Sequence, residues 1–514
     1  MNFFITNNVS TSMSGIEHAQ IKRLHLFNSE GGQAMIVTVK HWTNTHTVLK
    51  INGIPNDQHI NAFDFYQGTH ETEKKENTIK QYQDNEQYEV TFLGPNGQTD
   101  LAYRVVDKDD EKKNYIIQTN TGNGQITSFI YMEPDGQSFK KYDYYDERGF
   151  LSSRTTIDDK RRPIFEEYFD LDGNVVIEIK TIYPRGVQKV SSIMVKYQGE
   201  TTVLGSTDEF QTKFLDDLNL AYGHGEKVNN FFSDRMELTH SVAKMKTPAY
   251  KYMMIHSGHA YDPHDVMHSR LNENYEYGLR HAALFDGFIV PTHQQQLDLR
   301  ARFSGVDTRV YSVSVGIADP EIPYADFEQR DHKTILAVAR LSPEKRLEDM
   351  VKAFNIVHKE IPDAKLDIWG YAMNDFEVNK LLIAINRFGL QETVRLRGYT
   401  KNIAEVYDHS ICLANTSKVE GAPLSMVEAI NHGVPIVAYD IKYGAPQIIE
   451  EGENGYLIKE GDYKEMAKIF INILKDPFLQ KTLSTRAYES ASRFYPDAVW
   501  QMWQQVLNHE EPVE

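Results

Sequence analysis

Short apolar runs recur along most of the chain, and each is followed by a segment whose apolar positions have helical spacing. The runs lie at residues 2–6, 34–39, 334–341, 411–414 and 436–438, and residues 252–259 read as a strand leading into a loop. Apolar runs of this length, alternating with helices, are typical of strands buried in parallel sheets. The pattern predicts an α/β architecture in which functional sites form where the strands end.

Residues 70–200 follow a different pattern. Turn sequences rich in Gly, Asp and Asn recur there, at 94–97, 122–124, 134–136, 146–149 and 170–174. Apolar and polar residues alternate between these turns, as they do in successive β-hairpins. We therefore expect an inserted antiparallel β-meander domain within the α/β chain.

Several candidate functional residues lie in one stretch, residues 415–440. It reads as a strand end, a loop, a short helix and a second buried strand, with Pro423 at the first helical position and Gly433 just past the helix end. The backbone N–H groups of Leu424 and Ser425 then offer an anion site. Glu420 before the helix and Glu428 within it bracket that site, an arrangement suited to a phosphate flanked by hydroxyl-rich groups, as in a nucleotide sugar.

Two further segments point to the same ligand. Arg340 and Lys345, in the segment 338–346, lie just past the carboxyl end of a predicted strand, where two cations can neutralise a departing diphosphate. Gly15 lies between the strand at 2–6 and a predicted helix, where a glycine lets a diphosphate approach the backbone closely.

The motif Glu420-x7-Glu428 within EGAPLSMVEAINHGVPIV, together with ARLSPEK at 339–345, resembles the donor site of retaining glycosyltransferases of family 4. These have the GT-B fold, two Rossmann-like domains facing across a cleft, and act without metal. The resemblance implies that Glu428 holds the ribose and Glu420 the donor sugar. It places the leaving diphosphate against Arg340, Lys345, Gly15, Leu424 and Ser425, and counts Gly421 among the donor-binding residues. Tyr399 either touches the base or is an aromatic residue at the edge of the core.

A histidine-rich segment, residues 256–268, supports two readings. His256, His259, His264 and His268 have spacings found in zinc sites, but the Gly and Pro between them break any helix and no Cys completes the set. The family resemblance instead puts a histidine at the sugar, with His259 expected there and His256 as the alternative. Two Asp-x-Asp sequences, Asp107/Asp109 and Asp170/Asp172, are interpreted as turn residues rather than metal ligands.

The opening sequence and the β insert together most resemble the bacterial N-acetylglucosaminyltransferases that modify Ser-Asp-repeat adhesins. That resemblance implies UDP-N-acetylglucosamine as donor, no permanently bound cofactor, serine hydroxyls of an acidic repeat as acceptor, and same-face attack assisted by the leaving phosphate. Two alternatives stay open: transfer to a teichoic acid polyol phosphate, and a non-catalytic acceptor-binding companion chain. An acidic acceptor would need a basic groove, for which the insert offers Lys140, Lys141, Arg154, Lys160, Arg161 and Arg162.

The expected domains are a first Rossmann-like domain in two parts, 1–69 and 201–318, the insert at 70–200, and a nucleotide-sugar domain at 319–490. A final helix in 491–514 is expected to cross back to the first domain. The insert is a candidate surface for acceptor binding and for a homo-oligomer.

Composition limits the remaining possibilities. The 514 residues carry a formal net charge of −18, which argues against nucleic acid as a general partner. Cys412 is the single cysteine, so an intramolecular disulfide framework is excluded. No apolar run approaches the ~20 residues of a membrane span, and the first residues lack the features of a signal peptide. We expect a cytoplasmic protein.

Overall fold

The computed structural model describes residues 1–11, 13–97, 100–110, 112–133, 135, 138–223, 228–306 and 308–512. The predicted turn at 134–136 lies partly outside the described residues. Contacts divide the chain into two compact units, and each is described by itself. The first comprises Met1–Met13 and Gln33–Tyr250, and the second comprises Ser14–Gly32 and Lys251–Glu514.

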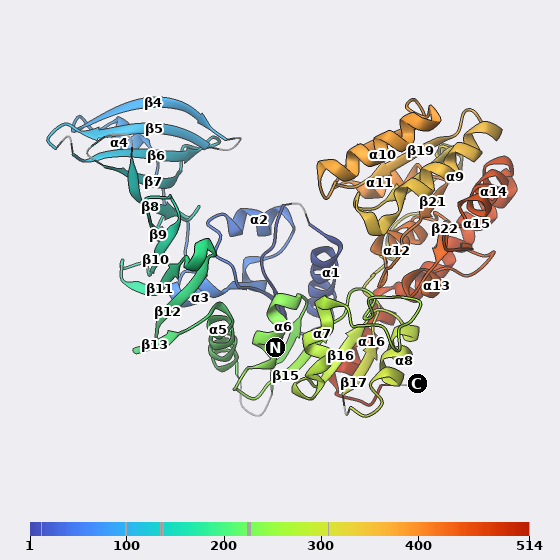
Figure 1. The fold of residues 1–514 in the computed structure, drawn as a ribbon, viewed down its shortest axis with the longest axis horizontal. Helices are drawn as coiled ribbons and strands as arrows, with labels where there is room; N and C mark the ends of the chain where they lie inside the picture. The colour runs from blue at the N-terminus through green and yellow to red at the C-terminus, as the bar shows by residue number, and fades with distance from the viewer. Residues whose placement is uncertain are drawn as a thin grey trace. The chain divides into compact units, whose positions relative to one another are not determined.

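Two parallel sheets and one antiparallel sheet account for the strands (Figure 1), so the predicted α/β fold with an inserted β-meander is confirmed. The first parallel sheet has the order β17-β16-β15-β14-β1-β2-β3. Its strands are β1 (Asn2–Thr6), β2 (Ala34–Thr38), β3 (His59–Asn61), β14 (Asn230–Ser233), β15 (Tyr250–Met254), β16 (Gly287–Val290) and β17 (Arg309–Ser312). Every residue of β1 is buried, as expected for a strand covered on both faces.

The helices that accompany these strands fall in both units. Those of the first unit are α2 (Thr45–Ile51), α3 (Ala62–Gln67), α5 (Thr207–Ala221) and α6 (Met236–Ala243), whereas the short α4 (Lys80–Gln83) packs against the insert. The second unit adds α1 (Gly15–Ser29), α7 (Glu273–Arg280), α8 (His293–Arg302) and the C-terminal α16 (Pro496–Leu507). Helix α16 packs on α1 through Trp503, whose ring meets that of Phe27 edge to face at 5.0 Å.

The insert is a ten-stranded sheet in which each strand pairs antiparallel with its neighbours in sequence, in the order β13-β12-β11-β10-β9-β8-β7-β6-β5-β4. A typical turn follows β10, where the Asp170 carboxylate accepts hydrogen bonds from the backbone N–H groups of Asp172 and Asn174, and Gly173 has φ +83°. The strands are β4 (Tyr88–Asn96), β5 (Asp100–Asp107), β6 (Asn114–Asn120), β7 (Ile126–Met132), β8 (Phe139–Tyr145), β9 (Leu151–Ile157), β10 (Pro163–Phe169), β11 (Val175–Ile182), β12 (Lys189–Tyr197) and β13 (Glu200–Leu204).

The second parallel sheet has the order β20-β19-β18-β21-β22-β23 and carries the predicted donor site. Its strands are β18 (Thr334–Val338), β19 (Lys365–Trp369), β20 (Val394–Gly398), β21 (Cys412–Asn415), β22 (Ile436–Asp440) and β23 (Gly455–Lys459). Its helices are α9 (Leu347–Glu360), α10 (Asp375–Phe388), α11 (Ile403–Asp408), α12 (Leu424–Asn431), α13 (Gly444–Ile448), α14 (Tyr463–Lys475) and α15 (Pro477–Ser490).

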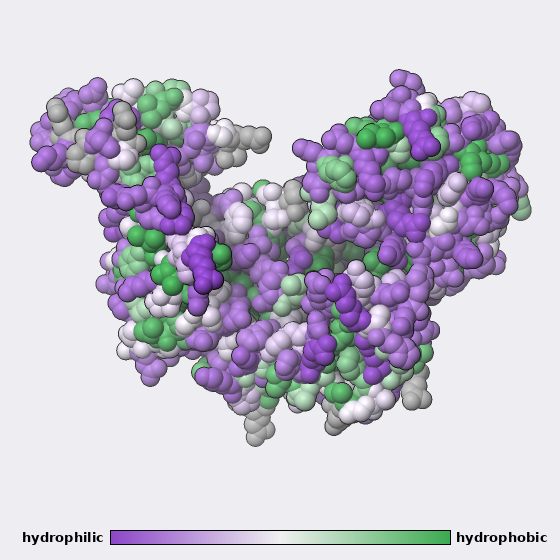
Figure 2. All heavy atoms as spheres, in the orientation of Figure 1, coloured by the Kyte–Doolittle hydropathy of each residue, from purple (hydrophilic) through white to green (hydrophobic). Residues whose placement is uncertain are grey.

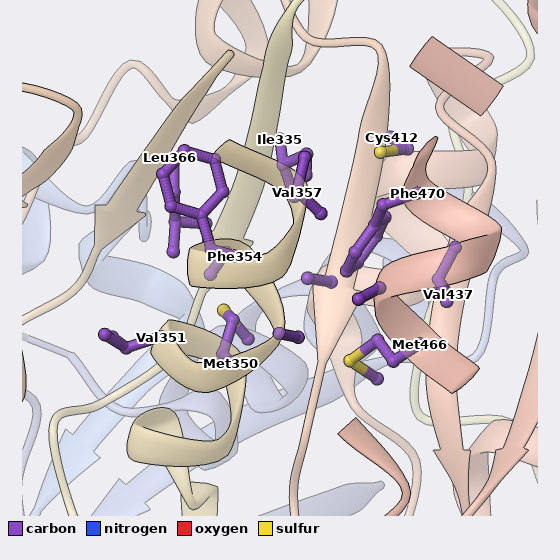
Figure 3. Close-up of a cluster of buried hydrophobic side chains, with 14 of the residues drawn as sticks. Ile335, Met350, Val351, Phe354, Val357, Leu366, Cys412, Val437, Met466 and Phe470 are labelled. Atoms are coloured by element: carbon purple, nitrogen blue, oxygen red, sulfur yellow. The ribbon is translucent and has the colours of Figure 1, made fainter. Parts of the chain in front are cut away.

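Alternate residues of these strands point to opposite faces of the sheet, and each face has its own core. Ile335 of β18 faces α9 and α14, where Phe354 and Phe470 pack against it (Figure 3). The next residue, Leu336, faces the other side, where Met426 of α12 is buried. This double burial explains the continuous apolar runs in the sequence, and it fixes α12 on the sheet.

Candidate functional site

Helix α12 begins one residue later than predicted. Pro423 is the N-cap residue, with φ −70° and the extended ψ of 116°, and Leu424 is the first helical residue. The prediction that Pro423 occupies the first helical position is therefore wrong; a proline lacks an N–H to leave unpaired at either position, so sequence alone does not separate them. Gly433 has φ +66° just past the helix end, as predicted. The backbone N–H groups of Leu424 and Ser425 have no acceptor in the described part of the chain.

Two glycines allow the loop before α12 to approach its neighbours. A Cβ on Gly421 would lie 2.2 Å from the carbonyl oxygen of His256, so only glycine fits at this distance. A Cβ on Gly444 would lie 2.3 Å from Cδ of Pro423. The loop that carries Glu420 is thereby held between the segment after β15 and the start of α13.

Glu420 and Lys345 form the most enclosed ion pair of the site. Nζ of Lys345 lies 2.5 Å from Oε1 of Glu420, and the two side chains are 17% and 12% exposed. The Ser417 hydroxyl donates to the same carboxylate oxygen at 2.6 Å. The Thr416 hydroxyl donates to the Lys345 carbonyl oxygen at 2.8 Å, which ties the loop after β18 to the loop after β21.

Arg340 follows β18 and is more open to solvent. Its Nη2 lies 2.8 Å from Oε1 of Glu344, which also accepts the Ser342 hydroxyl at 2.7 Å. These hydrogen bonds, with Arg340 and Lys345 nearby, hold the pKa of the Glu344 carboxyl below its usual value, although burial opposes the shift. Both predicted cations thus lie on one loop and each is paired with a carboxylate.

The Glu428 carboxylate has two side-chain partners that were not predicted from the sequence. Nζ of Lys22, on α1, lies 3.0 Å from its Oε1, and the Tyr407 hydroxyl donates to its Oε2 at 3.3 Å. A Cβ on Gly15, at the start of α1, would lie 4.0 Å from Cδ1 of Leu424, so the first turns of α1 and α12 are neighbours. Lys22 and Glu428 are 406 positions apart in the sequence, so no local pattern indicates this pair.

Tyr399 follows β20 and is 37% exposed. Its ring meets that of Tyr371 edge to face at 6.3 Å, and its hydroxyl lies 3.5 Å from Nε2 of His18 on α1. Burial lowers the pKa of His18, which favours the neutral imidazole. The base contact expected for Tyr399 remains a prediction.

The histidine segment separates into buried and exposed members. His259 has no exposed surface; burial, with the positive charge of Arg302 nearby, lowers its pKa to about 4, and its Nδ1 lies 3.4 Å from the Tyr443 hydroxyl. The sugar contact expected for His259 remains a prediction. His256 is half-buried, and its carbonyl adjoins Gly421 as described above.

His264 and His268 are exposed and lie near Glu460 and Asp265, at 3.1 Å each. Across the residues that the structure describes, no three His, Cys, Asp or Glu side chains gather in a metal-binding group. The Asp-x-Asp residues form turns: Asp107 is buried and accepts the backbone N–H of Asp109 at 3.0 Å.

The basic side chains of the insert are largely engaged within it. Arg154 makes a two-point contact with Asp143 at 2.7 and 2.9 Å, and Arg162 pairs with Asp158 at 2.6 Å. Lys140 lies 3.4 Å from Asp159, while Lys141 and Arg161 lie over aromatic rings. Figure 2 shows apolar and polar residues interspersed over the insert, where Phe92, Leu93, Tyr144, Ile164 and Ile182 are exposed.

A cavity of about 590 Å³ lies in the first unit, along β13, α5 and α6. Carboxylates and amines both line it, among them Asp216, Asp217, Lys213 and Lys244. None of the predicted donor-site residues does, so the cavity is unrelated to that site. No described helix is long and apolar enough to cross a membrane.

Comparison with known proteins shows which family model and which proteins this chain resembles. The family model described as Glycosyl transferases group 1 matches residues 320–490. The chain is 23% identical over 521 residues to the UDP-N-acetylglucosamine--peptide N-acetylglucosaminyltransferase GtfA subunit of Streptococcus agalactiae, covering 97% of this chain and 96% of that protein. It is 26% identical over 407 residues to the Poly(glycerol-phosphate) alpha-glucosyltransferase of Bacillus subtilis (strain 168), covering 77% of this chain and 58% of that protein.

A solved structure of the pneumococcal O-GlcNAc transferase GtfA, in complex with UDP and GlcNAc, has a TM-score of 0.81 with this chain at 19% identity. The likeness covers 99% of this chain and 98% of that one, the insert included.

Proposed function

Because the chain belongs to the retaining glycosyltransferases of family 4 and has their GT-B fold, we propose that it transfers N-acetylglucosamine from UDP-N-acetylglucosamine to serine hydroxyls of acidic Ser-Asp-repeat adhesins. The observation that carries this proposal is the similarity to the Streptococcus agalactiae protein, which extends over nearly the full length of both chains. Similarity confined to residues 320–490 would have supported a donor site and left the acceptor open.

The donor diphosphate binds where Arg340, Lys345 and the first turns of α1 and α12 meet. Leu424 and Ser425 offer backbone N–H groups, and Gly15 lies beside Leu424, so two helix N-termini face one region. As the glycosidic bond breaks, the diphosphate gains negative charge, and the two cations and the helix ends stabilise it. No metal is needed for this step, so transfer proceeds in the presence of a chelator.

The carboxylates orient the groups on either side of the diphosphate. Glu428 accepts the ribose hydroxyls, Glu420 accepts hydroxyls of the donor sugar, and Tyr399 lies against the base. Of the two histidines, we assign His259 to the donor sugar, and His256, half-buried beside the Gly421 loop, is the alternative. The acceptor serine attacks on the face from which the diphosphate leaves, and the leaving phosphate takes the serine proton.

The test is UDP release from a panel of UDP sugars with a Ser-Asp-repeat peptide, with teichoic acid, or with no acceptor. Glu420→Ala and Lys345→Ala are the comparison variants, and His259→Gln against His256→Gln separates the two histidines. Peptide-dependent release from UDP-N-acetylglucosamine, lost in the first two variants and indifferent to chelator, is the expected result. UDP release only with teichoic acid would show that teichoic acid, not the peptide, is the acceptor. No release with any donor would refute the proposal.

A second candidate function is transfer to a teichoic acid polyol phosphate. It is favoured by the similarity to the Bacillus subtilis protein, which covers 77% of this chain. A polyol phosphate and a Ser-Asp repeat are both anionic, so both would need cations at the acceptor surface. Because Lys140, Arg154 and Arg162 are ion-paired, Lys141, Lys160 and Arg161 are the first residues to test for that role.

A non-catalytic companion chain is the third alternative. Glu420, Glu428, Arg340 and Lys345 are all present, and each is ion-paired. Tight binding of the repeat peptide without turnover would favour this alternative. The open strands β4 and β13, each paired on one side only among the described residues, are where we propose that a homo-oligomer or a second chain joins the insert.

A further inference from the structure

The partners of Glu428 have no role in the function proposed so far. Lys22 donates to its Oε1 from α1, and Tyr407 donates to its Oε2 from the end of α11. No other described side chain hydrogen-bonds to this carboxylate. The side chains of Lys22 and Glu428 are 32% and 26% exposed, so the pair lies at an accessible surface rather than in the core.

The number of hydrogen bonds that the Glu428 carboxylate can accept indicates a function for Lys22 and Tyr407. An ionised carboxylate has about four lone-pair positions, two on each oxygen. Lys22 occupies one position on Oε1, and Tyr407 occupies one on Oε2, sharing its single hydroxyl proton with the Ser425 carbonyl oxygen at 3.2 Å. About one position therefore stays open on each oxygen, which matches two adjacent hydroxyl donors such as the cis-diol of a ribose.

The Tyr407 side chain is held firmly. Tyr407 is fully buried, and burial together with the charge of Glu428 raises the pKa of its hydroxyl well above the usual value, so the hydroxyl stays a donor at neutral pH. Its backbone carbonyl accepts Nη1 of Arg330 at 3.1 Å, and Nη2 of the same guanidinium donates to the carbonyl of His432, just past α12. Arg330 thus ties the end of α11 to the end of α12 and fixes the distance between the Tyr407 ring and Glu428.

We propose that Lys22 and Tyr407 are positioning residues that aim the Glu428 carboxylate at a ribose cis-diol and so make the donor site selective for ribonucleoside diphosphates over deoxy analogues. This inference rests on the proposed nucleotide-sugar function. It assigns to α1 a part in donor selectivity through Lys22, which touches Glu428 and need not touch the ligand.

The experiment is isothermal titration calorimetry of the full chain with UDP, 2′-deoxy-UDP, 3′-deoxy-UDP and uridine. Each deoxy analogue lacks one hydroxyl that would donate a hydrogen bond to the charged carboxylate. Because such hydrogen bonds are stronger than those between neutral groups, wild type should bind each deoxy analogue about 10- to 100-fold more weakly than UDP. Lys22→Met should lower this ratio at least fivefold, and Tyr407→Phe should lower it less. Lys22→Arg should keep it, and His25→Gln, at an exposed position of the same helix, should match wild type.

Each outcome decides between the inference and a rival. If Lys22 only stabilises the packing of α1, Lys22→Met should weaken the binding of UDP and of the deoxy analogues by the same factor. The ratio of their affinities would then stay unchanged, which would overturn the inference. If Lys22 contacts a phosphate, Lys22→Met weakens UDP but not uridine, which also overturns it. Wild type that binds no UDP at all would refute the proposed function itself, whereas bound UDP with a ratio that Lys22→Met preserves would refute only the positioning role.

Discussion

The Lys345–Glu420 pair permits a sharp test of how the donor site is held together. Replacing Lys345 by Met removes the ammonium group and keeps a side chain of similar length. Glu420 is then left 12% exposed, with the Ser417 hydroxyl at 2.6 Å as its remaining side-chain partner. A carboxylate so enclosed has lost much of its hydration without a compensating charge.

The size of the effect follows from this enclosure. Removing one partner of a fully buried ion pair costs about 3–5 kcal/mol of stability. Because both side chains keep some contact with water and Ser417 still donates, we expect about 2–3 kcal/mol for Lys345→Met. The double variant Lys345→Met/Glu420→Gln removes both charges, so most of this loss should be recovered. Transfer should fall at least about 100-fold in both, because the diphosphate loses a cation in each.

Urea unfolding followed by tryptophan fluorescence measures the stability, and UDP release measures the transfer. Trp369, in β19 of the same sheet, reports on this half of the chain. Lys475→Met is the matched control, since Lys475 pairs with Glu360 where the two side chains are 53% and 59% exposed. It should change stability by no more than a few tenths of a kcal/mol.

A double variant no more stable than Lys345→Met would refute the reasoning, because the cost would then not arise from an unpaired charge. A single variant as stable as the Lys475→Met control would refute it as well. Stability recovered without recovery of transfer is the expected pattern, and it would separate the structural role of the pair from its role toward the donor.

Three further predictions use other parts of the chain. Gly389 and Gly433 have φ +68° and +66°, but a Cβ on Gly433 would lie 2.0 Å from the Tyr488 ring and one on Gly389 would meet nothing within 4 Å. Alanine should therefore cost about 1 kcal/mol at Gly389 through backbone strain, and about 1–3 kcal/mol more at Gly433 through overpacking; equal unfolding midpoints would contradict this. Burial lowers the pKa of His59 to about 4, so between that value and about 6.5 the unfolded chain binds more protons and stability falls as the pH falls. Thermal or urea unfolding should show that the stability lost between pH 7 and pH 5 is about 2 kcal/mol smaller in His59→Gln than in wild type. An equal loss of stability in the two proteins would refute the assignment of this pH dependence to His59. Finally, chelator should leave UDP release unchanged, and release restored by added Mg²⁺ would show that the cations and helix ends are not sufficient.

Local pattern predicted the elements well. The apolar run 411–414 lies within β21 and its neighbouring residue, and the alternation and turns of 70–200 became the ten-stranded meander. Both predictions rest on side-chain periodicity, which each segment carries by itself. The start of α12 was misplaced by one residue at Pro423, because proline is tolerated both at the cap and in the first turn.

The sequence by itself determined the fold class, the alternation of strands and helices, and the residue types of the donor site, because these depend on periodicity and on motifs within single loops. Tertiary structure decided what those residues touch. It paired Lys22 with Glu428 across 406 residues, enclosed His259 against Tyr443, and paired Arg154 of the expected basic groove with Asp143. These outcomes depend on which elements pack together, and long-range packing chooses among many arrangements that the same local patterns allow.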